Sequence, residues 1–120
     1  MSRILVAEDE AAVSAFVVRA LTHRGHEVVA VTDGLGALER LGAEAFDLLL
    51  TDIVMPGLDG IALALKASKD FPALRILLMT GYAAERQRAH NIEALVHRVI
   101  AKPFTLHEIC DAVETELAAR

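Results

Sequence analysis

The sequence contains few of the residues on which disulfide-rich, metal-thiolate and aromatic-rich proteins depend. It has one cysteine, Cys110, no tryptophan, and only 4% aromatic residues among its 120 positions. A single cysteine excludes an internal disulfide and most metal-thiolate sites. Hydrophobic residues nevertheless make up 54% of the chain. We therefore expect a core of Ala, Val, Ile and Leu, with Cys110 packed into it as a small apolar side chain.

Features typical of membrane and nucleic-acid proteins are also absent from the sequence. No apolar run reaches the roughly 18 residues that a membrane-spanning helix needs, and no basic leader precedes a cleavage site. The net charge of −5 argues against sequence-independent binding of phosphate backbones. We therefore expect a cytoplasmic protein that binds neither membrane nor nucleic acid. The five histidines show no metal-ligand spacing and are expected at the surface: His23, His26, His90, His97 and His107.

Five short apolar segments alternate with five segments of helical character. The strands are predicted at 3–7, 28–31, 46–52, 75–80 and 96–101. Strands that alternate with helices indicate parallel pairing through right-handed crossovers. The fold class is therefore predicted as α/β, a flavodoxin-like (βα)5 three-layer sandwich with a five-stranded parallel sheet in the order 2-1-3-4-5. We expect residues 1–120 to form one domain, with no output domain.

The predicted helices are identified by their apolar spacing and by their capping residues. The expected apolar positions are Val13, Phe16, Val17, Ala20 and Leu21; then Leu35, Leu38 and Leu41; then Ile61, Ala64 and Leu65; and finally Ile109, Val113 and Leu117. The segment 83–92 is more polar and is predicted as a helix with a weak apolar stripe. Asp33 and Asp59 are predicted to cap helix starts, Thr105 and Glu108 form a capping-box pattern, and Gly25 ends the first helix.

Polar residues stand where four of the predicted strands end. Glu8 and Asp9 follow the first strand, Asp52 ends the buried third strand, Thr80 ends the fourth, and Lys102 follows the fifth. In a parallel sheet these positions converge on one edge. Two carboxylates about 4 Å apart repel by roughly 4 kcal/mol at an effective dielectric near 20. Such a cluster indicates a cation, and oxygen ligands in an open site favour Mg²⁺. With a nucleophilic carboxylate, a lysine and a hydroxyl, the set can hold a transferring phosphoryl group.

On these residues the chain resembles the receiver domains of two-component response regulators over essentially its whole length. The matching motifs are Glu8-Asp9, the segment 52–60 (Asp-Ile-Val-Met-Pro-Gly-Leu-Asp-Gly), Thr80, and Lys102-Pro103-Phe104. One such motif alone would be weak evidence, whereas four at the correct strand ends are strong evidence.

The resemblance implies a role for each residue of the edge cluster. Asp52 would accept a phosphoryl group from a histidine kinase or a histidine phosphotransfer protein. Asp9, Asp52 and the backbone carbonyl of Val54 would ligate Mg²⁺, with Glu8 acting mostly through water. Lys102 would bind the phosphoryl oxygens. The chain would not be an enzyme beyond Mg²⁺-dependent self-phosphorylation and slow self-dephosphorylation.

The resemblance also implies a switch, and here the sequence departs from the usual pattern. Thr80 would move toward the phosphoryl group, while the backbone of Val54 and Gly81 would contact it. Family members usually have an aromatic residue at the position of Val99, so the usual aromatic relay is absent. Met-Thr-Gly-Tyr at 79–82 resembles the FATGUY-type receivers, which leads to the hypothesis that Tyr82 and Gly81 replace the relay. A Tyr82 that merely packs in a loop is the alternative.

A second departure concerns the lifetime of the phosphorylated state. Receivers that hydrolyse quickly tend to carry amide or acidic side chains two residues after the Asp and two after the Thr. Here these positions are Val54 and Tyr82, which predicts a slowly decaying acyl phosphate.

The Lys102-Pro103 bond is expected to be cis, as in the family.

Three other functions fit the sequence less well than a receiver does. Aspartyl-phosphate hydrolases usually carry a second Asp where this chain has Val54. Nucleotide binding needs a glycine-rich first turn, whereas residues 7–12 read Ala-Glu-Asp-Glu-Ala-Ala. A receiver that docks partners without phosphorylation is disfavoured because the site is intact.

The output of the domain follows only from resemblance. The overall pattern is similar to the CpdR-type cell-cycle regulators of alphaproteobacteria, which influence substrate delivery to the ClpXP protease. A protein partner would dock on the face formed by the helix at 83–92, the strand at 96–101 and the last helix. The alternatives are a phosphate-shuttling receiver in a phosphorelay and a phosphorylation-independent docking module.

Overall fold

The computed structural model describes residues 2–81 and 98–119, without the side chain of Arg98. In this part of the chain the elements are β1 (Arg3–Ala7), α1 (Ala11–His23), β2 (Glu27–Val31), α2 (Gly34–Ala43), β3 (Leu48–Asp52), α3 (Gly60–Asp70), β4 (Arg75–Thr80), β5 (Arg98–Ala101) and α5 (Leu106–Ala118). These elements agree with the predicted alternation. The helix predicted over 83–92 and the start of the strand predicted at 96 lie outside the described residues.

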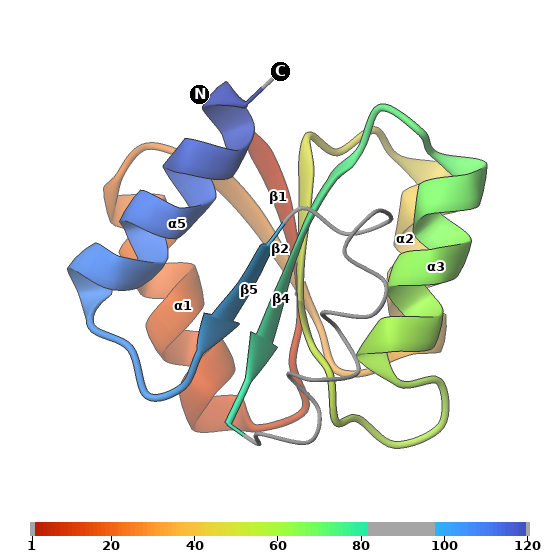
Figure 1. The fold of residues 1–120 in the computed structure, drawn as a ribbon, viewed down its shortest axis with the longest axis horizontal. Coiled ribbons are helices and arrows are strands. Elements are labelled where there is room, and N and C mark those ends of the chain that lie inside the picture. Colours follow the sequence, from red (N-terminus) through yellow and green to blue (C-terminus); the bar gives the residue numbers. More distant parts are fainter. Residues whose placement is uncertain (1, 82–97, 120) are drawn as a thin grey trace.

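The five strands form one parallel sheet in the order β2-β1-β3-β4-β5, as predicted (Figure 1). In the centre of the sheet Leu5 of β1 pairs with Leu49 of β3, which in turn pairs with Ile76 of β4. All five residues of β3 are buried. The prediction that the third strand is buried is therefore confirmed.

Helices cover both faces of the sheet and divide the core into two layers. α1 and α5 lie against one face, and α2 and α3 lie against the other (Figure 1). Alternate strand residues enter opposite layers, so Ile4 and Val6 pack toward α1 and α5 while Leu5 packs toward α2 and α3. Cys110 is fully buried in the α1 and α5 layer, as expected.

The predicted helix boundaries are confirmed by their capping contacts. Asp33 accepts a hydrogen bond from the Gly36 amide at 2.7 Å, and Asp59 accepts one from the Ala62 amide at 2.9 Å. Thr105 and Glu108 form the reciprocal capping box of α5. Gly25 has a φ of 93°, the left-handed conformation expected after α1.

The prediction that apolar helix positions face the core is wrong at three residues. Leu35 of α2 is 65% exposed, and Phe16 and Leu65 are also exposed. In α2 the buried stripe runs through Gly34, Ala37 and Leu41 instead. Leu35 is adjacent to Gly34 in the first turn, about 100° around the helix, and therefore falls on the solvent side.

The expectation that the histidines lie at the surface is wrong for His26. Its side chain is only 10% exposed, and its Nε2 lies 3.4 Å from a carboxylate oxygen of Glu114 on α5. His26 directly precedes β2, so the packing of α5 against this end of the molecule covers it. His90 and His97 lie outside the described residues.

Candidate functional site

The side chains of Glu8, Asp52 and Lys102 lie on the face of the sheet that α1 and α5 cover. Ile4 and Val6 precede Glu8 on alternate positions, Leu48 and Leu50 precede Asp52, and Ile100 precedes Lys102. All five of these apolar residues pack in the layer of α1 and α5. The period of two along a strand therefore directs the three polar side chains to the same face at the carboxyl edge of the sheet.

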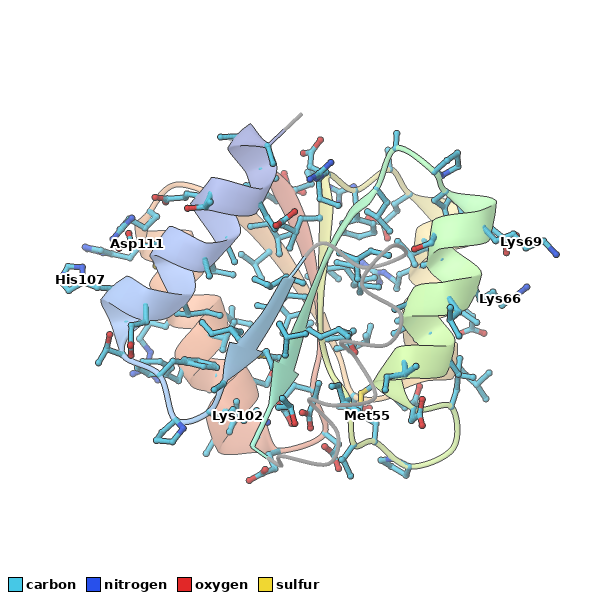
Figure 2. The ribbon with its side chains drawn as sticks, viewed as in Figure 1. Met55, Lys66, Lys69, Lys102, His107 and Asp111 are labelled. Carbon is cyan, nitrogen blue, oxygen red and sulfur yellow. The ribbon has the colours of Figure 1, made fainter. Side chains whose placement is uncertain are left out.

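Lys102 joins the two buried carboxylates. Its Nζ lies 2.8 Å from Oε1 of Glu8 and 3.2 Å from Oδ1 of Asp52. Figure 2 shows Lys102 at the end of the molecule where the strands terminate. The other oxygen of Glu8, Oε2, accepts a hydrogen bond from the backbone amide of Glu10 at 3.0 Å. The predicted convergence of these residues is thus observed.

Burial changes the protonation behaviour of all three groups. Burial raises the pKa of Asp52, and the nearby Lys102 charge only partly counteracts it. Burial likewise raises the pKa of Glu8 against the hydrogen bonds from Lys102 and Glu10. For Lys102 burial alone would lower the pKa, but the hydrogen bond to Glu8 and the charge of Asp52 outweigh it, so the pKa is raised. The carboxylates therefore carry a charge that their surroundings do not fully stabilise.

Three carboxylates are arranged as a cation site would require. Glu8, Asp9 and Asp52 each offer one oxygen, and these oxygens lie within 4.8 Å of one another. Glu8 and Asp52 are buried, whereas Asp9 is exposed, so the cluster opens to solvent on one side. An all-oxygen set with an open side fits Mg²⁺, which retains several waters and shares phosphate oxygens. The residues present therefore fit the ion that the sequence indicates.

A cleft of about 700 Å³ opens beside the cluster. Asp9, Asp52 and Lys102 line it together with apolar side chains of α1 and of the loop after β5. Among these, Phe16 and Phe104 lie with their ring centroids 6.3 Å apart. Val54, two residues after Asp52, is 46% exposed and also lines the cleft. Asp52 is thus reachable from solvent through an opening that is partly apolar.

The residues predicted to form the switch are only partly described. Thr80 is buried at the end of β4, and its carbonyl oxygen accepts a hydrogen bond from the Lys102 amide at 2.8 Å. Gly81 is exposed at the cleft. Val99 is half-buried against the layer of α2 and α3. Tyr82 lies outside the described residues, so its role as a relay stays a hypothesis.

Gly60 contributes to the site in a way that no local sequence pattern indicates. A Cβ atom at this position would lie 2.0 Å from the carbonyl oxygen of Asp52. The Gly60 amide also donates a hydrogen bond to the carbonyl of Ile53 at 2.8 Å. The start of α3 therefore packs directly on the backbone that carries Asp52. The sequence predicts Asp59 as the cap of this helix, but it contains no signal for the close approach of Gly60 to Asp52.

The peptide bond between Lys102 and Pro103 is cis, as expected. None of the helices in residues 2–81 and 98–119 combines the length and hydropathy of a membrane span.

Known proteins with similar sequences include response regulators and transcriptional regulatory proteins. The chain is 42% identical over 119 residues to the response regulator receiver protein CpdR of Brucella abortus, covering 99% of each chain. It is 32% identical to the transcriptional regulatory protein TcrA of Mycobacterium tuberculosis, but it spans only 42% of that longer protein.

Solved structures show the same fold. The response regulator TrrA from Thermotoga maritima, in complex with Mg²⁺-BeF, superposes with a TM-score of 0.87 at 28% identity, covering 96% of this chain and 98% of that one. A putative response regulator from Chloroflexus aurantiacus gives a TM-score of 0.89 at 27% identity, with 98% of both chains covered. The family model described as the response regulator receiver domain matches residues 4–114 of the chain. With this fold and this cluster of acidic residues and lysine, the chain belongs to the family of response regulator receiver domains.

Proposed function

We propose that this chain accepts a phosphoryl group on Asp52 and thereby switches the binding of a protein partner. The observation that carries the proposal is the contact between Lys102 and Asp52, at 3.2 Å, inside an acidic cluster that opens to a cleft. A carboxylate needs a neighbouring cation to accept a group that is itself negatively charged. The phosphodonor would be a histidine kinase or a histidine phosphotransfer protein.

The chemistry is a transfer between two nucleophiles. An oxygen of Asp52 forms a bond to phosphorus while the phosphorus–nitrogen bond of the donor phosphohistidine breaks, and its electron pair returns to the imidazole. Bound Mg²⁺ would supply charge neutralisation for the phosphoryl oxygens. Lys102 already lies beside the accepting oxygen and would contact the incoming phosphoryl group. Asp9, Asp52 and the Val54 carbonyl would hold the ion, with Glu8 close by.

The consequences of phosphorylation would start at Thr80 and at the backbone of Val54 and Gly81. Thr80 is buried one strand away from Asp52, and its carbonyl is bonded to the Lys102 amide. A phosphoryl group that draws Thr80 and Lys102 toward itself would therefore alter the end of β4 and the start of the loop after β5. We place the downstream docking surface on the neighbouring face, of which β5 and α5 are described.

The resemblance to CpdR-type regulators supports a more specific output. The chain is 42% identical to the CpdR protein of Brucella abortus over 99% of both chains, which favours a shared role in signalling. We propose cell-cycle control through delivery of substrates to the ClpXP protease. A phosphate-shuttling receiver is the second candidate, because the site geometry serves a shuttle equally well.

Phosphoryl transfer can be tested with a small phosphodonor and the purified chain. Incubation with acetyl phosphate and Mg²⁺ should yield a phosphorylated species by intact-protein mass spectrometry. Asp52→Asn should abolish it, whereas Asp70→Asn, which changes an exposed carboxylate on α3, should leave it unchanged. Phosphorylation of the Asp52→Asn variant to the wild-type extent would refute the assignment.

The output can be tested by affinity capture. Asp52→Ala and wild type treated with phosphodonor should retain different sets of partners from a lysate. Retention of a protease component by one form alone supports the proposed output. Retention of only histidine phosphotransfer proteins supports a shuttle, and identical sets from both forms indicate docking that ignores phosphorylation.

A further inference from the structure

Glu8 and Asp9 are adjacent carboxylates in different surroundings. The Glu8 side chain is fully buried at the end of β1, whereas Asp9 is exposed at the cleft. Each oxygen of Glu8 already has a donor from the chain itself, Lys102 Nζ at 2.8 Å and the Glu10 amide at 3.0 Å. An ion that took Glu8 as a direct ligand would have to compete with both donors.

Lys102 needs an anchor to act on Asp52. A lysine ammonium is a point charge on four flexible methylene groups, and ordering it in one place has an entropic cost. Its contact with Glu8 is shorter than its contact with Asp52, 2.8 Å against 3.2 Å. Glu8 itself is fixed, because its second oxygen is bonded to the backbone. The ammonium is therefore held from the Glu8 side and presented to Asp52.

We propose that Glu8 is a positioning residue, whose carboxylate holds the Lys102 ammonium against Asp52. The inference rests on the proposed phosphoryl transfer and divides the acidic pair into two roles. Asp9 acts on the ion, and Glu8 acts through the lysine. The Glu8 carboxylate, which follows β1, bonds a residue 94 positions later in the chain, and β3 and β4 lie between their strands in the sheet.

The proposal predicts that substitution of Glu8 lowers the rate of phosphorylation, whereas substitution of Asp9 lowers the affinity for Mg²⁺. Loss of a partner that orients a residue directly contacting the reacting group typically lowers activity by about tenfold or more. Glu8→Gln should therefore lower the rate of phosphorylation at saturating Mg²⁺ roughly tenfold, with Mg²⁺ affinity changed less than about threefold. Asp9→Asn should weaken Mg²⁺ binding more than about tenfold.

Glu10→Gln is the matched control for charge. It removes one negative charge from the neighbouring exposed side chain, while its backbone amide can still donate to Glu8. Affinity for Mg²⁺ is measured by following backbone amide shifts during titration, and the rate is measured with acetyl phosphate by mass spectrometry. A urea titration of each variant shows whether the fold is intact.

A second measurement requires neither Mg²⁺ nor phosphorylation. In the metal-free wild type the Lys102 ammonium should give a resolved nitrogen-15 signal with slow proton exchange, because two carboxylates hold it. Glu8→Gln should broaden or remove this signal, and Glu10→Gln should preserve it. A Glu8→Gln variant that keeps the signal overturns the positioning role, even if its phosphorylation is impaired.

The remaining outcomes are equally decisive. Glu8→Gln could instead lose Mg²⁺ affinity as Asp9→Asn does and regain the wild-type rate of phosphorylation when Mg²⁺ saturates the site. Glu8 would then be a metal ligand, and the positioning role would be refuted while the proposed phosphoryl transfer would stand. If Glu8→Gln matches Glu10→Gln in every measurement, Glu8 has no special role. If wild type takes up no phosphoryl group, the proposed function fails, and that result is distinct from either.

Discussion

The Asp52 carboxylate is kept in surroundings that disfavour its charge. It is buried at the end of β3, and its pKa is raised by that burial despite Lys102 at 3.2 Å. A carboxyl group with a raised pKa in the folded state contributes stability at low pH, and this contribution is lost as the pH rises through the folded pKa. Without metal, ionisation of Asp52 above its folded pKa therefore destabilises the fold.

Replacing Asp52 with Asn should stabilise the metal-free protein at pH 7. The amide keeps the shape of the side chain and removes the buried charge, so the unfolding temperature should rise by roughly 4 °C. The difference should shrink as the pH falls below the pKa of Asp52, where the wild-type group is neutral as well. Calorimetry between pH 4 and about 8 in the presence of a chelator would check this, with Asp70→Asn as the exposed control. A gap that widens toward acid would contradict it.

Gly60 is required because the Asp52 carbonyl occupies the place of its side chain. A Cβ atom 2.0 Å from that oxygen forces backbone movement, since no flexible side chain can give way. Gly60→Ala should therefore lower the free energy of unfolding by about 2–3 kcal/mol and reduce phosphorylation of Asp52. Urea denaturation and the acetyl phosphate assay measure the two effects.

Gly42 offers a control for this substitution. It also lies in a helix, α2, and a Cβ atom there would meet nothing within 4 Å. Gly42→Ala should stabilise the protein by about 0.5–1 kcal/mol through helix propensity alone. Equal destabilisation by both alanines would show that the contact at Gly60 is unimportant.

Val54 is expected to lengthen the life of the phosphorylated state. It is 46% exposed at the cleft, two residues after Asp52, and it has no polar atom to orient an attacking water. Val54→Asn should accelerate loss of the phosphoryl group in Mg²⁺ on the order of tenfold, because an amide can position that water. The decay is followed after removal of acetyl phosphate. Rapid decay in wild type, unchanged by the substitution, would contradict the prediction.

Among the elements, α5 is joined to the sheet by an ion pair at the end opposite the site. Arg75 at the start of β4 lies 3.0 Å from Glu116 of α5, and the two side chains are 25% and 5% exposed. A charge this deeply buried is tolerated only with a partner. The pair therefore fixes the carboxyl end of α5 against β4.

Removing Glu116 should leave the Arg75 charge buried without this partner. Glu116→Ala is expected to lower the free energy of unfolding by about 2–3 kcal/mol, less than the 3–5 kcal/mol of a fully buried pair because Arg75 is partly solvated. Asp70→Ala breaks the exposed pair with Lys66 on α3, whose lysine points to solvent in Figure 2, and should cost only about 0.3–0.5 kcal/mol. Urea denaturation compares the two. Similar losses would show that the α5 pair contributes no more than a surface contact.

At the scale of the whole molecule, Mg²⁺ should stabilise the fold. The carboxyl edge of the sheet brings oxygens of Glu8 and Asp9, which follow β1, within 4.8 Å of an oxygen of Asp52, and this arrangement exists only when the sheet is formed. A ligand that binds only the folded state adds stability by mass action, about 2.7 kcal/mol at 100 times its dissociation constant. The unfolding temperature should therefore rise with the logarithm of Mg²⁺ concentration. Asp9→Asn should suppress the rise, while NaCl at equal ionic strength should not reproduce it.

The strand order was predicted from the fold class, whereas the sequence alone indicated the alternation of strands and helices and the residues that meet at the carboxyl edge. These depend on signals within a few residues of one another, such as the apolar run before Asp52 and the caps at Asp33 and Asp59. In a parallel sheet such local signals are enough to assemble the site, because every strand ends at the same edge.

The partner of each side chain depends on the folded packing. Lys102 lies closer to Glu8 than to Asp52, Gly60 packs on the Asp52 carbonyl, and His26 lies under α5. These contacts join residues distant in the chain or depend on how a helix is rotated against the sheet. No local pattern encodes such distances, since they result from the register of strands and the packing of layers.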